Sequence, residues 1–297
     1  MPTPPIPFQA LSGTRVLSLA LNLPGPAALL RCRRMGAACT KLEPRAPSGH
    51  ASGDPMATYS PGAYADLHDG IRVLQANLKT DAGQAVLQDE LAQADVLITS
   101  FRPSALHKLG LGWPALAARY PRLSLVRIVG APDERAEEPG HDLTYLAQAD
   151  LIAGCTLPPT LYADMAGALI ATEAVLQAQL ARAASGQGVC IDVALEDAAQ
   201  WLGLPRGWAL SSAAGDVGGG HAGYGVYPCA DGRVAVAALE PHFAARFFSA
   251  AGLATDSDAR LPATRSAVAR FLQGQTRSSL DALAVSQDIP LHTLAPG

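Results

Sequence analysis

The chain has 297 residues, of which 49% are hydrophobic and only 16% are charged. This composition excludes an intrinsically disordered protein, because such chains are poor in apolar residues and rich in net charge. The 22 basic and 26 acidic residues give a net charge of −4 without a Lys/Arg-rich block, so no nucleic-acid partner is expected. Polar residues and prolines interrupt the apolar stretches before they reach membrane-spanning length, so no membrane protein is expected either.

The five cysteines are dispersed along the chain and include no C-x-x-C pair. A structural zinc site requires clustered ligands, and a secreted disulfide scaffold uses a dense, even set of cysteines. We therefore expect free thiols, no bound metal and a reducing compartment. The first seven residues lack the basic and apolar regions of a signal peptide, which favours a cytoplasmic location.

The first 70 residues predict a βαβ unit followed by a loop. A short buried strand is expected over 15–20, and the Pro24-Gly25-Pro26 stretch ends it. A helix over 27–35 and a second strand over 37–42 follow. Residues 43–70 are rich in Pro, Gly, Ser and Asp and show no periodicity, so a long loop is expected there.

The next part of the chain alternates helices with buried strands. The expected elements are a helix over 82–93, a strand over 95–99, short helices over 103–109 and 114–119, and a strand over 123–129. Such alternation predicts an α/β fold with a parallel sheet, in which ligands bind at the carboxyl ends of the strands.

The second half of the chain predicts two further groups of elements. A long helix over 164–184, a strand over 189–193 and a helix over 195–210 extend the first domain. A hairpin over 226–238 and helices over 241–251 and 265–273 form a second group. We expect a large α/β domain over 1–211, a Gly-rich flexible linker over 212–225 and a small domain over 226–297.

Three acid–base candidates stand beside expected helix starts. His141 lies in a Gly-His-Asp stretch, Asp164 immediately precedes the long helix, and Glu240 precedes Pro241. Taken singly, each has an ordinary structural explanation: a surface loop histidine, a helix N-cap and a helix-initiating acid. Together, two carboxylates and an imidazole suffice to move a proton next to a carbonyl group. Free N–H groups at a helix start can also stabilise a developing enolate.

Three basic residues are weaker candidates for phosphate binding. Lys41, Arg45 and Arg102 lie at or just beyond the ends of expected strands. The glycines at 218–220 are typical of a linker, and a loop that covers a phosphate or a substrate is the alternative.

The order of several segments resembles the family III CoA-transferases (the CaiB/BaiF-like family), and within them the α-methylacyl-CoA racemase branch. The Gly-His-Asp stretch at His141 is similar to the racemase form of its segment. The resembling segments cover most of the chain and are 11–17, 36–43, 75–79, 94–112, 140–147, 163–167, 185–193 and 227–243.

The resemblance implies a Rossmann-like large domain, a small α+β domain and an interlocked homodimer acting on acyl-CoA thioesters. Asp164 corresponds to the family's catalytic carboxylate, and His141 and Glu240 to the additional acid–base residues of the racemases. Arg102 corresponds to a CoA-contacting arginine, and Lys41 and Arg45 fall near another basic contact. No cofactor is implied beyond the coenzyme A that forms part of the substrate.

Three functions follow from this resemblance. The first is an epimerase, in which His141, paired with Glu240, serves one face of the α-carbon and Asp164 the other. The second is a CoA-transferase, in which Asp164 attacks the thioester. The third is a non-catalytic CoA-binding member. It is favoured by the loss of the family's basic stretch at 68–72 and by a chain that ends at Gly297, before the family's C-terminal return segment.

Overall fold

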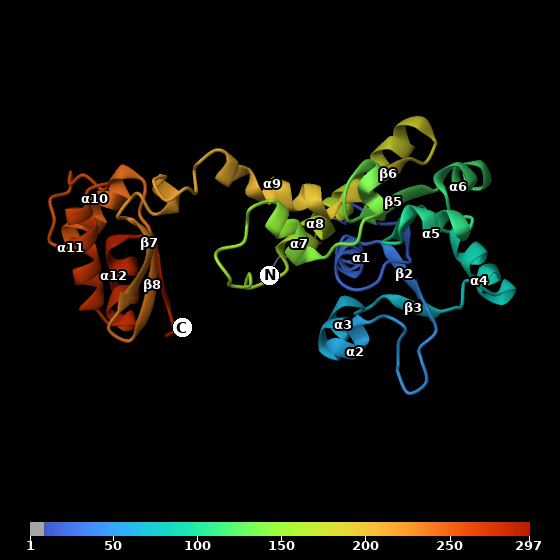
Figure 1. Cartoon of the computed structure of the whole chain (residues 1–297), viewed down its shortest axis with the longest axis horizontal. Coiled ribbons are helices and arrows are strands. Elements are labelled where there is room, and N and C mark those ends of the chain that lie inside the picture. Colours follow the sequence, from blue (N-terminus) through green and yellow to red (C-terminus); the bar gives the residue numbers. More distant parts are fainter. Residues whose placement is uncertain (1–8) are drawn as a thin grey trace, which may run out of the picture. The chain divides into compact units, whose positions relative to one another are not determined.

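The computed structural model describes residues 9–297, so the segment used for the expected location lies outside the described residues. The chain divides into two compact units, Met1–Gly203 and Leu204–Gly297 (Figure 1). The division lies within helix α9 (Leu195–Gly207), upstream of the Gly-rich segment that the sequence suggested as a linker. Among the described residues, no helix combines the length and hydropathy that a membrane crossing requires.

A six-stranded parallel sheet forms the centre of the first unit, which confirms the predicted α/β class. Its strand order is β3-β2-β1-β4-β5-β6. This is the doubly wound order, in which the chain moves outward in one direction and then in the other. The direction reverses between β1 and β4, and doubly wound sheets commonly bind their ligands at such a point. The strands are β1 (Arg15–Ser18), β2 (Ala38–Glu43), β3 (Arg72–Gln75), β4 (Val96–Thr99), β5 (Ser124–Val129) and β6 (Cys190–Ala194).

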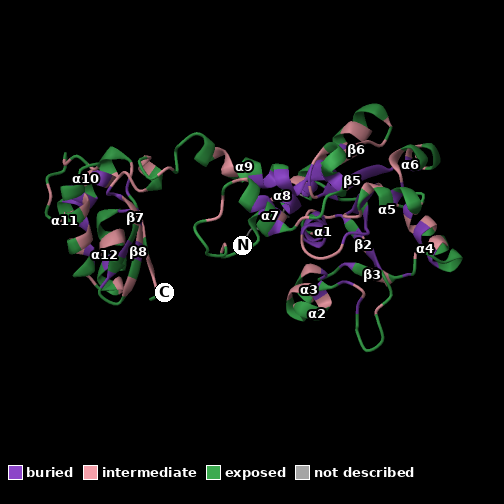
Figure 2. Ribbon diagram, in the orientation of Figure 1, coloured by how far each residue is buried: buried purple, intermediate pink, exposed green. Residues whose placement is uncertain are grey.

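Helices cover both faces of this sheet because successive strand residues alternate between two apolar clusters. Val16, Ile98 and Val126 belong to one cluster, and their neighbours Leu17, Leu97 and Leu125 to the other. The first cluster includes residues of α1 (Pro24–Arg34) and α8 (Tyr162–Ser185). The second includes residues of α4 (Asp81–Leu91), α5 (Pro103–Lys108) and α6 (Trp113–Arg119). The buried residues in Figure 2 follow these layers.

The expected loop over 43–70 is wrong in part. It contains two short helices, α2 (Met56–Tyr59) and α3 (Pro61–Leu67), and β3 follows it. Helix α7 (Asp142–Gln148) was also not expected. These elements have only four to seven residues, which is too short to show a helical or alternating apolar pattern.

The second unit is an antiparallel sheet with three helices packed on it. The sheet order is β7-β8-β9, from β7 (Tyr224–Cys229), β8 (Gly232–Ala237) and β9 (Leu291–Leu294). The helices are α10 (Pro241–Ala250), α11 (Pro262–Gln273) and α12 (Arg277–Gln287). The predicted hairpin and the two helices that follow it are present, and α12 and β9 were not expected.

The Gly-rich segment that the sequence suggested as a linker falls within the second unit and makes specific contacts there. Asp216 accepts two hydrogen bonds from the Arg260 guanidinium, at 3.0 and 2.9 Å. Arg265 of α11 donates to the carbonyl oxygens of Gly219 and His221. Ala222 is fully buried, and its N–H donates to the Ala259 carbonyl at 2.8 Å. The glycines permit this close packing: a Cβ on Gly220 would lie 2.5 Å from the Ala214 carbonyl oxygen.

Candidate active site

A cavity of about 600 Å³ opens at the carboxyl ends of the central strands. Its walls include residues 21–24 after β1, residues 100–102 after β4 and residues 128–130 around the end of β5. The cavity therefore lies where the strand order reverses, the usual ligand position in doubly wound sheets. Apolar side chains and a few polar groups line it, as is typical of a small-molecule site.

His141 and Asp164, two of the predicted acid–base residues, both line this cavity. His141 is the residue before α7, and Asp164 is in the first turn of α8. The Thr144 hydroxyl fixes the backbone of His141, because it accepts from the His141 N–H at 3.0 Å and donates to the His141 carbonyl at 2.7 Å. The side chains of these two acid–base candidates thus come from adjacent helix starts.

The expectation that Asp164 precedes the long helix and caps it is wrong. Helix α8 begins at Tyr162, with Leu161 at the N-cap position, so Asp164 is the third helical residue. The Asp164 N–H donates to Oδ1 of Asp142 at 3.0 Å. That N–H is therefore not free to stabilise an enolate. Instead, the contact joins the starts of α7 and α8 and holds the carboxyl group of Asp164 at the cavity.

The surroundings of Asp164 favour its protonated form. Burial, followed by repulsion from the nearby Asp142 carboxylate, raises the pKa of Asp164 from 3.8 to about 6, and His141 opposes the shift. A carboxyl group with a pKa near neutrality can both accept and donate a proton under ordinary conditions. Groups with such perturbed pKa values occur frequently at functional sites.

Tyr145 of α7 completes the wall behind the two acid–base residues. It is buried, and burial followed by the charge of Asp164 raises the pKa of its phenol. Its ring occupies the space beside Gly140, where a Cβ would lie 2.6 Å from the ring carbon atoms. The glycine before His141 is therefore required for close packing of α7, which the sequence alone did not indicate.

Arg102 also lines the cavity, as its predicted role in binding a phosphate requires. It is exposed and occupies the N-cap position of α5, three residues after the end of β4. Glu137 holds the start of α5 by accepting from the Ser104 N–H at 2.6 Å and from its hydroxyl at 2.9 Å. An exposed guanidinium at the cavity mouth can pair with an anionic group of a ligand.

The other two basic candidates do not line the cavity. Lys41 lies on β2 and is fully buried, where its ammonium group pairs with Asp54, contacts Nε2 of His68 at 2.9 Å and lies 3.5 Å from Glu43. Arg45 is exposed in the segment after β2. Sequence position at a strand end did not reveal that the Lys41 side chain points inward.

Glu240, the third acid–base candidate, belongs to the second unit. It is exposed and precedes Pro241, the first residue of α10, as the sequence predicted. Its side chain makes no capping hydrogen bond to that helix. Its part in a common site with His141 and Asp164 remains a prediction.

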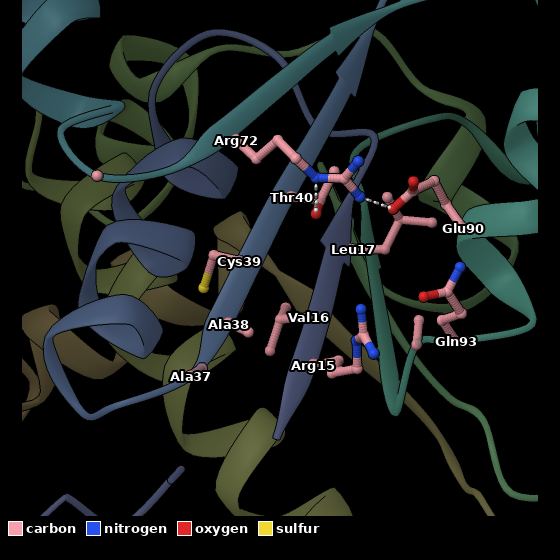
Figure 3. Close-up of a pocket in the computed structure, with 12 residues that line it drawn as sticks. Arg15, Val16, Leu17, Ala37, Ala38, Cys39, Thr40, Arg72, Glu90 and Gln93 are labelled. Atoms are coloured by element: carbon pink, nitrogen blue, oxygen red, sulfur yellow. Dashed lines mark hydrogen bonds and ion pairs between the residues drawn. The ribbon is translucent and has the colours of Figure 1, made fainter. Parts of the chain in front are cut away.

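A second cavity, of about 440 Å³, lies at the amino ends of β1 and β2 (Figure 3). Arg72 reaches across it to pair with Glu90 and to donate to the Thr40 hydroxyl at 3.3 Å. None of the predicted site residues lines this cavity. Within residues 9–297, no group of three or more His, Cys, Asp or Glu side chains is arranged to hold a metal ion.

Comparison with known proteins identifies the family. The family model described as CoA-transferase family III matches residues 11–295. The chain is 30% identical over 266 residues to alpha-methylacyl-CoA racemase of Mus musculus, covering 84% of this chain and 66% of the racemase. It is 31% identical to the probable fatty acyl-CoA transferase Rv3272 of Mycobacterium tuberculosis, over 66% of this chain and 53% of that protein.

Solved structures show the same fold. A CAIB/BAIF family protein from Brucella suis superimposes with a TM-score of 0.77 at 23% identity, covering 95% of this chain and 82% of the other. The chain spans slightly less than two thirds of the mouse racemase and about half of the mycobacterial protein. The family match over nearly the whole sequence confirms the resemblance, and the chain belongs to CoA-transferase family III.

Proposed function

We propose that the protein is an acyl-CoA epimerase that inverts the carbon α to a CoA thioester, as the name of its racemase relatives suggests. The observation that carries this proposal is that His141 and Asp164 line one cavity, with the pKa of Asp164 raised to about 6. A transferase needs one nucleophilic carboxylate, whereas an epimerase needs two groups that exchange protons.

The reaction moves one proton away from the α-carbon and another one onto it. One residue, acting as a base, removes the α-proton, and the electron pair of the broken C–H bond delocalises into the thioester carbonyl as an enolate. The other residue, acting as an acid, then delivers a proton to the opposite face of the α-carbon. Starting from the other enantiomer, His141 and Asp164 exchange these roles.

The raised pKa of Asp164 suits both of these roles. An ordinary aspartate is almost entirely ionised at neutral pH and would be a poor proton donor. With a pKa of about 6, the carboxyl group stays ionised often enough to act as a base and is protonated often enough to act as an acid. Each such group contributes roughly 10²–10⁴-fold to the rate.

The remaining predicted residues serve binding in this proposal. Arg102 pairs with a phosphate of CoA at the mouth of the cavity. Glu240 stays the third acid–base candidate of the resemblance, and coenzyme A is required only as part of the substrate.

A CoA-transferase is the second candidate, favoured by the similarity to a probable fatty acyl-CoA transferase. The Asp164 carboxylate would attack the thioester carbonyl, the C–S bond would break and CoA thiolate would leave, which gives a mixed anhydride. The thiolate would next attack the aspartyl carbonyl, releasing the acyl carboxylate. A carboxylate acceptor then takes over the CoA. A third candidate is a member that binds CoA without turnover.

Exchange in D₂O separates these candidates. The chain is incubated with each enantiomer of a 2-methylacyl-CoA, and α-deuterium and inversion are measured by mass spectrometry and chiral analysis. We expect Asp164→Asn to abolish exchange from one enantiomer and His141→Ala from the other, while both variants lose inversion. Absence of α-deuterium, with CoA transfer to an added carboxylate, would establish the transferase instead. In that case His141→Ala should be nearly normal.

We also propose that the protein is a cytoplasmic homodimer. Exposed apolar side chains on α8, among them Met165 and Leu169, are the kind of surface that a second subunit covers. Light scattering at micromolar concentration tests this, and a monodisperse monomer would reject it.

A further inference from the structure

A fully buried cluster of charged side chains lies outside the proposed chemistry. Lys41 has no exposed surface, and Glu43 and Asp54 are each 1% exposed. Nζ of Lys41 pairs with Oδ2 of Asp54 and lies 3.5 Å from Oε2 of Glu43. Burying an ion pair of this kind costs desolvation energy, so stabilisation of the fold alone does not explain why the cluster is present.

Every ionised member of the cluster is satisfied by a specific partner. Glu43 accepts from the Ser52 hydroxyl at 2.6 Å, from the Tyr64 hydroxyl at 3.0 Å and from the Gln75 amide at 3.1 Å. Such complete pairing fixes the geometry of the segment between β2 and α2, because each lost contact would weaken the stabilisation of a buried charge.

His68 joins the cluster as a neutral acceptor. Its Nδ1 lies 2.6 Å from the Tyr64 carbonyl, so this nitrogen carries the proton, and Nε2 accepts from the Lys41 ammonium at 2.9 Å. Burial and the charge of Lys41 lower the pKa of His68, whereas Asp54 and Glu43 oppose this shift. The Lys41 ammonium group therefore contacts Asp54, Glu43 and His68, and it also lies 5.2 Å from the centre of the Tyr64 ring.

Asp54 connects this cluster to the active-site cavity. While Oδ2 pairs with Lys41, Oδ1 accepts from the Asn22 N–H at 3.1 Å and from the Met56 N–H at 2.9 Å. The Tyr59 hydroxyl donates to the Asn22 side chain at 3.2 Å. Asn22, Met56 and Tyr59 all line the cavity, so a single carboxylate joins the loop after β1 to α2. We call these three residues the Asn22–Tyr59 wall.

The Asn22–Tyr59 wall lies close to the proposed acid–base chemistry. Burial, followed by the charges of Asp54 and Asp164, raises the pKa of the Tyr59 phenol. The Tyr59 hydroxyl thus interacts electrostatically both with Asp54 of the cluster and with the proposed catalytic residue Asp164. Asn22 adopts a left-handed backbone conformation with φ of 64°, which a single firmly held amide helps to maintain.

We infer that Asp54, held by Lys41, is a positioning residue that keeps the Asn22–Tyr59 wall in the form that aligns the acyl thioester with Asp164. The inference rests on the proposed epimerase function and gives Lys41 a different task from the predicted contact with CoA. In this inference the Oδ1 acceptor of residue 54 positions the wall. Lys41 offsets the cost of burying the Asp54 carboxylate at that position.

Two double variants isolate the acceptor from the charge. Lys41→Met with Asp54→Asn removes one positive and one negative charge, so the net charge of the cluster is unchanged, and the amide oxygen still accepts from Asn22 and Met56. Lys41→Met with Asp54→Ala has the same charge but no acceptor. We expect the first variant to keep kcat for α-deuterium exchange close to wild type. We expect the second to lose roughly tenfold or more in kcat, because misalignment acts mainly on the chemical step.

Amide hydrogen exchange of the full-length chain provides a readout that does not depend on activity. In the Ala variant, peptides containing Asn22 and Met56 should exchange faster, while peptides covering the starts of α7 and α8 should be unchanged. In the Asn variant, all four regions should match the wild type. Thermal melting identifies any double variant that fails to fold. In that case the single variants Asp54→Asn and Asp54→Glu take the place of the double variant that failed.

The outcomes distinguish this inference from the proposed function. Equal kcat and equal amide exchange in the two double variants would overturn the positioning role, even if the protein is an epimerase. A protein without α-proton exchange in any form would overturn the proposed function. The amide exchange of Asn22 and Met56 would then still decide whether Asp54 holds the wall.

Discussion

Replacement of Asp164 by Asn should make the protein more stable at neutral pH while it abolishes the proposed chemistry. Burial and the nearby Asp142 raise the pKa of this carboxyl group from 3.8 to about 6. The folded state therefore binds a proton more tightly than the unfolded state. Above pH 6 the carboxyl group must ionise in unfavourable surroundings, and stability is reduced. A neutral amide of the same shape avoids this penalty.

The magnitude follows from the size of the shift. A change from 3.8 to about 6 corresponds to about 3 kcal/mol in the free energy of unfolding once both states are ionised. The charge also interacts favourably with the N-terminal end of the α8 dipole, which offsets about 0.3–1 kcal/mol. We therefore expect Asp164→Asn to raise the free energy of unfolding by about 2 kcal/mol at pH 8.

Urea denaturation of wild type and variant at several pH values provides the assay. The difference should be largest at pH 8, decrease as the pH falls below 6 and vanish well below pH 3.8, where the carboxyl group is protonated in both the folded and the unfolded state. Asp89→Asn, at an exposed position on α4, is the matched control and should change stability by less than about 0.5 kcal/mol at every pH. An Asp164→Asn variant that is less stable than wild type at pH 8, or a difference independent of pH, would refute this account of the site.

Three further predictions test individual contacts. Asp142→Asn removes a negative charge beside Asp164, so the pKa of Asp164 should fall below about 6. The pH–rate profile for α-proton exchange should then shift toward lower pH, and an unchanged profile would contradict the assigned repulsion. Arg102→Gln should weaken binding of CoA by roughly tenfold in isothermal titration calorimetry, and the affinity of the variant should depend less on salt concentration than that of wild type. Equal affinity of variant and wild type would exclude a phosphate contact. Gly140→Ala should destabilise the protein by about 1–3 kcal/mol in urea denaturation, because its Cβ would lie 2.6 Å from the Tyr145 ring; a neutral effect would mean that α7 shifts without cost.

The local sequence determined five of the six strands of the central sheet, all except β3, and most of the long helices. Apolar residues in β4 and β5 and the long pattern of α8 identify their elements directly, because burial on one or both faces imposes a periodicity along the chain. The order of segments also identified the family, which the family match confirms. The sequence also indicated His141 and Asp164 as acid–base candidates and Arg102 as a phosphate-binding candidate. All three line the central cavity.

Only the tertiary structure decided what these residues contact. Lys41 and Arg45 lie four positions apart, yet one is fully buried against Asp54 and the other is exposed, because the side-chain direction depends on how β2 packs. The raised pKa of Asp164 requires burial and the proximity of Asp142, 22 residues earlier in the chain. Burial and distance arise from the packing of segments that are remote in sequence, so periodicity and spacing along the chain carry no information about them.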